Sequence, residues 1–210
     1  MIAIFIIICT CSIFFIKLSL ENKISILSLR STPINIYSQP QATSIFNLND
    51  NYRPMNYIKQ KKYIDHNNDT ISELTTALMW QKDGSSIPLN YQSGTNYIKR
   101  LNENQYKGFN DWRLPTVEEL MSLLEPKKNP LFINNLFNNK GMHYWSADKL
   151  AAKTPFGERV NSAWGVDFSF GYVFWAYLKT ENYVKAVRSI GRIQRMGDAS
   201  LFSLSEPGLR

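Results

Sequence analysis

Residues 110–116 read Asn-Asp-Trp-Arg-Leu-Pro-Thr, and Val117-Glu118-Glu119-Leu120 follow directly. Thr116 is a suitable helix cap, because Glu119 can reach back to the amide of Thr116 while the threonine hydroxyl accepts from the amide of Glu119. Pro115 offers no amide hydrogen and biases Leu114 towards an extended conformation. The stretch therefore predicts an extended arm that turns into a helix at Thr116, and its role is architectural.

Two helices are expected around this arm. Asn90 can cap the first, in which apolar residues recur at helical spacing on Gly94, Tyr97, Ile98 and Leu101. The second begins after Thr116, and Pro126 should end it, because the residue before a proline disfavours the helical conformation.

The remaining patterns are those of strands. Residues 77–81, 142–147 and 183–190 are strand candidates, and residues 163–168 alternate with a period of two. Residues 172–178 continue this pattern after a turn near 169–171, which predicts a hairpin. Two helices packed on a small, mainly antiparallel and aromatic-rich sheet predict an α+β fold.

The net charge of +7 does not predict nucleic-acid binding. Residues 1–62 contain seven Lys or Arg and two acidic residues, whereas residues 63–210 contain seventeen and fifteen, so the second part is close to neutral. A nucleic-acid-binding domain usually shows a clustered basic face. We therefore expect no nucleic-acid partner.

The first sixteen residues are almost wholly apolar, a length between a signal-peptide core and a membrane-spanning helix. We interpret residues 1–19 as a signal peptide or membrane anchor, residues 20–62 as a tether, residues 63–190 as the folded domain and residues 191–210 as a flexible tail. Both cysteines, Cys9 and Cys11, lie in the apolar segment, so the domain has no disulfide. These features predict an exported protein of the cell envelope, held at the membrane by its N-terminus.

A series of short motifs resembles one family in both order and spacing. They are Tyr63-Ile64-Asp65, Asp69-Thr70-Ile71, Ala77-Leu78-Met79-Trp80-Gln81, Gly108 to Thr116 with Glu119-Leu120, Tyr144-Trp145-Ser146, Ala163 to Phe168, Gly171 and Val184 to Arg188. This succession resembles the Legionella collagen-like C-terminal domain family, a bacterial family long labelled as a domain of unknown function. One departure is visible, because Ile98 stands where members often carry a cysteine.

The resemblance implies a C-type-lectin-like fold related to the formylglycine-generating enzyme scaffold. It also implies exported or surface proteins, a few of which are implicated in adhesion and in glycan or glycosaminoglycan binding. We expect a structural role for the motif residues, in which Trp112 fills the core and Arg113 pairs with a carboxylate. These residues are Trp80, Asn110, Asp111, Trp112, Arg113, Leu114, Pro115, Thr116, Glu119, Trp145, Trp164 and Arg188.

The best candidates for ligand contact are aromatic, because aromatic faces stack on sugar rings. They are Tyr172, Trp175, Tyr177, Trp145 and Trp164. Along the last hairpin strand Tyr172 falls on one face and Trp175 and Tyr177 on the other, so one aromatic face is either exposed or covered by residues 148–161. The alternative is that these rings pack the core.

Metal and cofactor signals are weak. Asp65, Asn67 and Asp69 have the spacing of the start of a calcium loop, but Thr70 and Thr76 stand where that loop requires Gly and Glu. No Glu-Pro-Asn or Gln-Pro-Asp sugar motif is present in the sequence. We predict no metal and no cofactor.

The sequence contains no evident catalytic constellation. We therefore predict a non-catalytic, envelope-associated binding or adhesion module whose partner is a glycan or a surface protein. Two alternatives stay open. One is an enzyme on the same scaffold that uses His143 or Asp167, and the other is a purely structural interaction domain.

Overall fold

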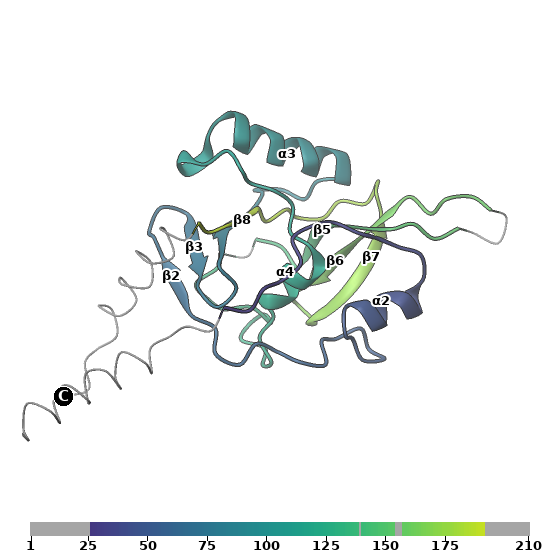
Figure 1. The fold of residues 1–210 in the computed structure, drawn as a ribbon. Helices are drawn as coiled ribbons and strands as arrows, with labels where there is room; N and C mark the ends of the chain where they lie inside the picture. Colours follow the sequence, from purple (N-terminus) through teal and green to yellow (C-terminus); the bar gives the residue numbers. More distant parts are fainter. Residues whose placement is uncertain (1–25, 139, 154–156, 192–210) are drawn as a thin grey trace, which may run out of the picture.

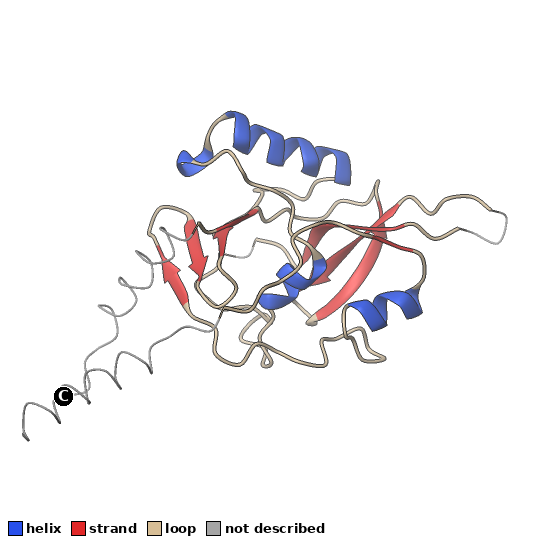
Figure 2. Ribbon diagram, viewed as in Figure 1, coloured by secondary structure: helices blue, strands red, loops and turns tan. Residues whose placement is uncertain are grey.

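The computed structural model describes residues 26–138, 140–153 and 157–191, and in this part of the chain three α-helices surround two curled β-sheets (Figures 1 and 2). The fold class is therefore α+β, as predicted. The single sheet that we expected is instead divided into two, and a third helix precedes the two that the sequence indicated.

The larger sheet has the strand order β1-β5-β6-β7, with β1 (Asn35–Ile36), β5 (His143–Leu150), β6 (Ser162–Asp167) and β7 (Tyr172–Tyr177). The strands β5, β6 and β7 are antiparallel, whereas β1 pairs in parallel with β5. The predicted hairpin is confirmed between β6 and β7. Its turn is fastened by Asp167, whose Oδ1 accepts from the amides of Ser169 and Phe170, and Gly171 supplies a positive φ of 72°.

The second sheet has the order β2-β3-β4-β8, with β2 (Tyr63–Asp65), β3 (Thr70–Glu73), β4 (Leu78–Gln81) and β8 (Val187–Ser189). All its pairings are antiparallel. The strand expected over residues 183–190 forms only β8. It joins β4 rather than the aromatic hairpin, and for this reason the strands belong to two sheets.

Both predicted helices are present, α3 (Tyr91–Glu103) and α4 (Val117–Ser122). Asn90 caps α3 by accepting from the amide of Ser93, and Thr116 and Glu119 form the reciprocal capping box of α4. Helix α4 ends at Ser122, before the proline that we expected to end it, and a short 3-10 helix, η1 (Tyr106–Gly108), follows α3.

The 110–116 stretch has the structural role that was expected. Trp112 is buried, and its backbone amide and carbonyl both bond the side chain of Asn102. Arg113 makes two hydrogen bonds of 2.6 Å to the carboxylate of Glu119. Asp111 pairs with Arg188, whose Nε donates to Oδ1 of Asp111 at 2.6 Å. The stretch thus connects α4 to the second sheet.

The expected tether is wrong for residues 26–62, which pack on the domain. Within this segment α2 (Gln39–Ile45) follows β1, and the buried residues are Ile36, Ala42, Phe46, Leu48 and Pro54. Phe46 makes an edge-to-face contact with Trp164 at a centroid distance of 5.8 Å. The segment has no sustained period because each of its turns buries only one or two side chains, and the sequence pattern therefore missed it. Residues 1–25 and 192–210, which include the apolar segment and nearly all of the predicted tail, lie outside the described part.

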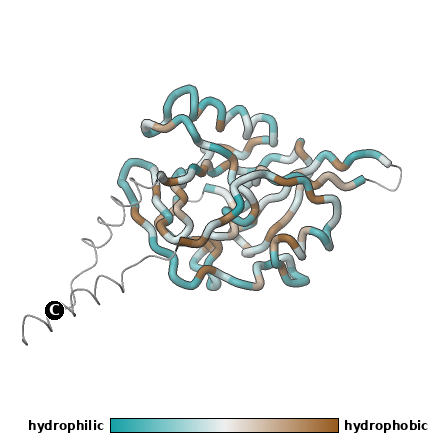
Figure 3. Tube along the Cα trace, viewed as in Figure 1, coloured by the Kyte–Doolittle hydropathy of each residue, from teal (hydrophilic) through white to brown (hydrophobic). Residues whose placement is uncertain are grey.

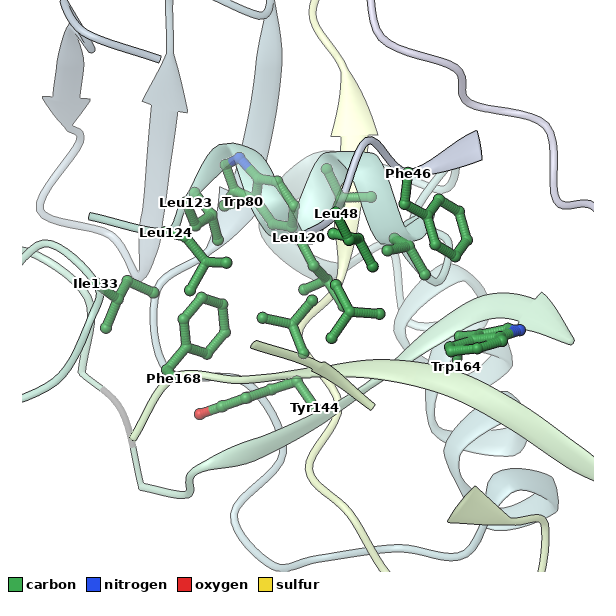
Figure 4. Packing of buried hydrophobic residues seen from close by; sticks show 14 of the residues in the cluster. Phe46, Leu48, Trp80, Leu120, Leu123, Leu124, Ile133, Tyr144, Trp164 and Phe168 are labelled. Atoms are coloured by element: carbon green, nitrogen blue, oxygen red, sulfur yellow. The ribbon is translucent and has the colours of Figure 1, made fainter. Parts of the chain in front are cut away.

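Each face of the larger sheet covers its own hydrophobic cluster. On one face Trp164, Val166 and Val173 join a cluster with Leu120, and Figure 4 shows the leucines at the end of α4 projecting towards this sheet. On the other face Trp145 joins a cluster with Tyr91, Ile98 and Leu101 of α3. The outward trace of α3 is largely hydrophilic (Figure 3). The middle of the sheet is therefore inaccessible from either side.

We expect Phe46→Ala to lower the free energy of unfolding by about 3–5 kcal/mol, because it leaves a cavity beside Trp164. Urea unfolding measures the effect. Tyr37→Ala, which removes an exposed aromatic ring of the same segment, is the matched control and should change stability by no more than about 0.5 kcal/mol. Equal, small effects of both changes would contradict the packing of this segment.

Candidate functional site

The predicted ligand-contact residues do not form one site. Trp145 and Trp164 are both 0% exposed, so neither ring can stack on a ligand, and the prediction of ligand contact is wrong for these two. Trp145 donates from Nε1 to the carbonyl of Leu89 at 2.8 Å and packs edge-to-face on Tyr91. Their aromatic character serves the two cores, which was the alternative reading.

The three predicted contacts on β7 lie on opposite faces of the strand, as the alternation predicted. Trp175 and Tyr177 are in edge-to-face contact at 5.8 Å, and Tyr177 is 60% exposed. Tyr172 lies on the other face, beside Phe170 and Phe174. Among the predicted contacts, Tyr177 thus offers the most open ring.

A groove lies beside Tyr177, at the end of the larger sheet where β5 leaves it and β6 enters it. The groove has a volume of about 510 Å³. Its lining consists of Asn35, Tyr37, Lys149, Leu150, Ala151, Ala152, Lys153, Arg159, Val160, Asn161, Ser162 and Leu178. An adjoining hollow of about 390 Å³ shares Lys149 and Leu178 with it and adds Lys179. The register places Tyr177 opposite Ser162, which lines the groove, although Tyr177 itself is not among the lining residues.

One wall of the groove is an arm formed by residues 151–153 and 157–161, which projects from the body of the molecule (Figure 1). Two backbone interactions hold the ends of the arm together. Lys153 and Arg159 form an isolated antiparallel β-bridge, and the amide of Val160 donates a hydrogen bond to the carbonyl of Ala152 at 2.9 Å. Lys153 and Arg159 are both exposed residues. The arm therefore contributes two cations to the groove lining, while the exposed Glu158 of the same arm is not a lining residue.

The charged residues that line the groove are all basic. Its described lining residues and those of the adjoining hollow include Lys149, Lys153, Arg159 and Lys179, but no Asp or Glu. Lys149 is fixed over the ring of Tyr91, with Nζ 4.7 Å from the ring centroid. Cations that converge on a concave surface raise the local concentration of anions there.

Sequence reasoning missed this groove. Its basic residues come from the end of β5, from the arm and from the residue after Leu178, and in the sequence they form no run. The signal that was available is the position of Lys149, Lys153 and Arg159 around the break between two strands, where side chains converge on the end of a sheet.

A separate hollow of about 360 Å³, away from the groove and its adjoining hollow, is lined in part by His143. The Nε2 atom of His143 lies 3.1 Å from Oδ2 of Asp167, whose carboxylate is fully buried, and the histidine ring packs edge-to-face on Phe174. The two residues of the enzyme alternative are thus adjacent. Glu181 and Asn182 also line the hollow, but its described lining contains no Ser, Thr or Cys that could act as a nucleophile.

The oxygen-rich run from Asp65 to Asp69 is a turn between β2 and β3. Lys82 pairs with Asp65 at 2.5 Å, and Lys107 pairs with Asp69 at 2.8 Å. In the part of the chain described by the structure, no group of three or more His, Cys, Asp and Glu side chains is placed to hold a metal ion.

Among the described basic residues, Lys185 has the most strongly shifted pKa. It is fully buried, and Nζ donates to the carbonyls of Lys82 at 2.7 Å and Gln81 at 3.3 Å, with the rings of Phe137 and Tyr144 within 6 Å. Burial lowers the pKa of its ammonium group from 10.5 to about 7, and the charge of Asp83 opposes this shift. Lys185 lines neither the groove nor the His143 hollow.

The fold and the site define a small α+β domain with a basic groove at the end of its larger sheet. Residues 69–188, more than half of the chain, match the family model described as the Lcl C-terminal domain, and the chain therefore belongs to this family. The resemblance noted in the motifs is thus confirmed. A comparison with curated proteins gives no match. Among the described residues, no helix has both the length and the apolar character required to cross a membrane.

We expect the unfolding free energy to rise with pH between about 7 and 10.5 through Lys185, because the folded state binds fewer protons than the unfolded state over this interval. Lys185→Met should remove this contribution, which has a slope of at most about 1.4 kcal/mol per pH unit. The measurement is urea unfolding of both proteins at several pH values. Lys99→Met, which removes an exposed lysine, should leave the slope unchanged.

Proposed function

We propose that this chain is a non-catalytic binding module of the bacterial cell envelope, and that it recognises an acidic glycan in the basic groove. The observation that carries the proposal is the convergence of Lys149, Lys153, Arg159 and Lys179 on one concave surface with no acidic residue in its described lining. The family to which the chain belongs has no established activity, so the proposal rests on the groove.

The chemistry of the groove suits a chain of sugars that carry carboxylate or sulfate groups. Lysine and arginine side chains donate charge-assisted hydrogen bonds to such groups. Tyr177, whose strand partner Ser162 lines the groove, is an exposed ring on which a sugar that extends beyond the groove can stack, and Trp175 contacts that ring edge-to-face.

We also propose that the scaffold is C-type-lectin-like and that the domain is exported. The support for the first is a loop-rich α+β domain with two short, curled sheets, together with the family resemblance. The support for the second is the apolar run from Met1 to Ile16 ahead of the domain.

Reversal of one groove charge tests the ligand site. Lys153→Glu should weaken binding of a sulfated or uronic-acid oligosaccharide by about threefold to tenfold, since one attraction becomes a repulsion. The matched control is Lys99→Glu, because Lys99 is an exposed lysine of α3 outside the groove. Calorimetric titration gives both affinities.

Salt supplies a further check of the same site. Binding to the unaltered chain should weaken as the salt concentration rises, because exposed charges are screened within about 10 Å at 0.1 M. Equal losses for Lys153→Glu and Lys99→Glu would show non-specific attraction by net charge and would contradict a groove site. Binding of neutral oligosaccharides with equal strength would contradict an acidic ligand.

Membrane fractionation tests the proposed location. The full-length chain should sediment with the envelope fraction or appear outside the cytoplasm, and replacement of two apolar residues by Asp, Ile6→Asp with Ile13→Asp, should retain it in the cytosol. A fully cytosolic pool of the unaltered chain would exclude the proposed export.

A further inference from the structure

We propose that residues 26–37, here called the strap, complete the ligand groove, with Asn35 and Tyr37 as ligand contacts and Arg30 as a positioning residue that holds the strap in place. The inference rests on the proposed function of the groove. The strap lies outside the residues that match the family model, which begin at residue 69. It therefore adds a feature that family membership alone does not supply.

The side chain of Arg30 attaches the strap to the rest of the domain, and we call its contacts with Asp148 and Glu118 the latch. The guanidinium donates to both carboxylate oxygens of Asp148, each at 2.8 Å, and to both oxygens of Glu118, one of them at 3.0 Å. Asp148 is fully buried, so an uncompensated charge would be costly there. The hydroxyl of Thr116 bonds the carbonyl of Arg30 at 2.9 Å. The latch thus joins the strap to β5 and to the start of α4.

From the latch, the strap runs into β1 along the edge of β5. The amide of Lys149 donates to the carbonyl of Ile34 at 3.1 Å, and the amide of Ala151 donates to the carbonyl of Ile36 at 2.7 Å. The register pairs Asn35 with Lys149, so these two side chains lie next to each other on one face of the sheet. Lys149 is the residue that both hollows share, and Asn35 therefore flanks the centre of the basic surface.

Tyr37 is exposed although its backbone is fixed on both sides. Before it, Ile36 is fully buried, and after it, Ser38 caps α2 by accepting from the amide of Gln41. The amide of Tyr37 itself donates to Oε1 of Gln41 at 2.7 Å. The side chain nevertheless keeps 62% of its surface exposed and lines the groove. A ring of this size, held at an open groove on a fixed backbone, is suited to contact with a ligand.

Because the strap lines the groove, a ligand bound there contacts both the strap and the basic residues of β5 and the arm. Docking of the strap and binding of the ligand are then thermodynamically linked, and each stabilises the other by the same free energy. Variants at Arg30 should change ligand affinity although the guanidinium is not itself part of the groove lining.

The experiment uses the full chain, a sulfated oligosaccharide as the probe, and two readouts, calorimetric affinity and hydrogen exchange of residues 30–37 and 149–151. Arg30→Ala should weaken probe binding by roughly tenfold and should increase exchange in both segments. Arg30→Lys should lie between this variant and the unaltered chain, since lysine keeps the charge but loses the bidentate geometry. Arg100→Ala, at an exposed arginine of α3, is the matched control.

Tyr37→Ala and Asn35→Ala separate ligand contact from positioning. Both residues are exposed, so these variants should fold normally, leave exchange unchanged, and weaken probe binding by roughly threefold each. Saturating probe should also slow exchange in residues 30–37 of the unaltered chain. If Arg30→Ala fails to fold, these two variants and the exchange measurement still decide the matter.

The outcomes separate this inference from the proposed function. Normal binding by the unaltered chain with no loss in the Tyr37, Asn35 or Arg30 variants would overturn the role of the strap and leave the basic groove standing. Loss of affinity in Arg30→Ala without increased exchange would show that Arg30 acts on the probe directly, which would overturn the positioning role. Absence of any binding by the unaltered chain would overturn the proposed function and this inference together.

Discussion

The buried carboxylate of Asp148 is the constraint on which the arrangement of the larger sheet depends. Each of its oxygens accepts two hydrogen bonds of 2.8 Å, from Arg30 and from one backbone amide, Ile34 for Oδ1 and Val117 for Oδ2. Removal of one partner of such a buried pair typically costs about 3–5 kcal/mol. A single side chain of β5 thereby fixes the strap, the first turn of α4 and the edge at which β1 adds to the sheet. The position of the groove follows from these hydrogen bonds of Asp148, because they hold the strap beside the end of β5.

The helix that the opening motif predicts carries a second, connected set of bonds. Glu119 caps the helix within its own turn and also accepts from Arg113, while Thr116 bonds the strap through its hydroxyl. The capping box was readable from the sequence because its partners lie three residues apart. The contact of Thr116 with Arg30 was not readable, because its partners lie 86 positions apart. Helix α3 and the β6–β7 hairpin, which are likewise local, were predicted, whereas the packed segment before Tyr63 and the division into two sheets depend on distant partners and were not.

The same distinction explains what could be predicted of the site. The period of two correctly assigned Tyr172 and Tyr177 to opposite faces of β7, since that property belongs to the strand alone. Whether a face is covered depends on elements elsewhere in the chain. Trp164 is covered by α2, a helix that the sequence pattern did not reveal, and Trp145 is covered by α3. The basic residues of the groove likewise meet only after the strap, β5 and the arm are brought together.

Because hydrophobic clusters cover both faces of the larger sheet, the middle of the sheet is closed to a ligand, and the groove lies instead at the end where β5 and β6 part. The residues there come from the strap, the end of β5, the arm, the start of β6 and Leu178, and of these only the strap lies outside residues 69–188, which match the family model. Changes in these segments can alter charge and shape at the groove while the core stays the same. Membership of the Lcl C-terminal domain family therefore accounts for the scaffold, whereas the proposed binding of this chain rests on the segments that the scaffold holds around the groove.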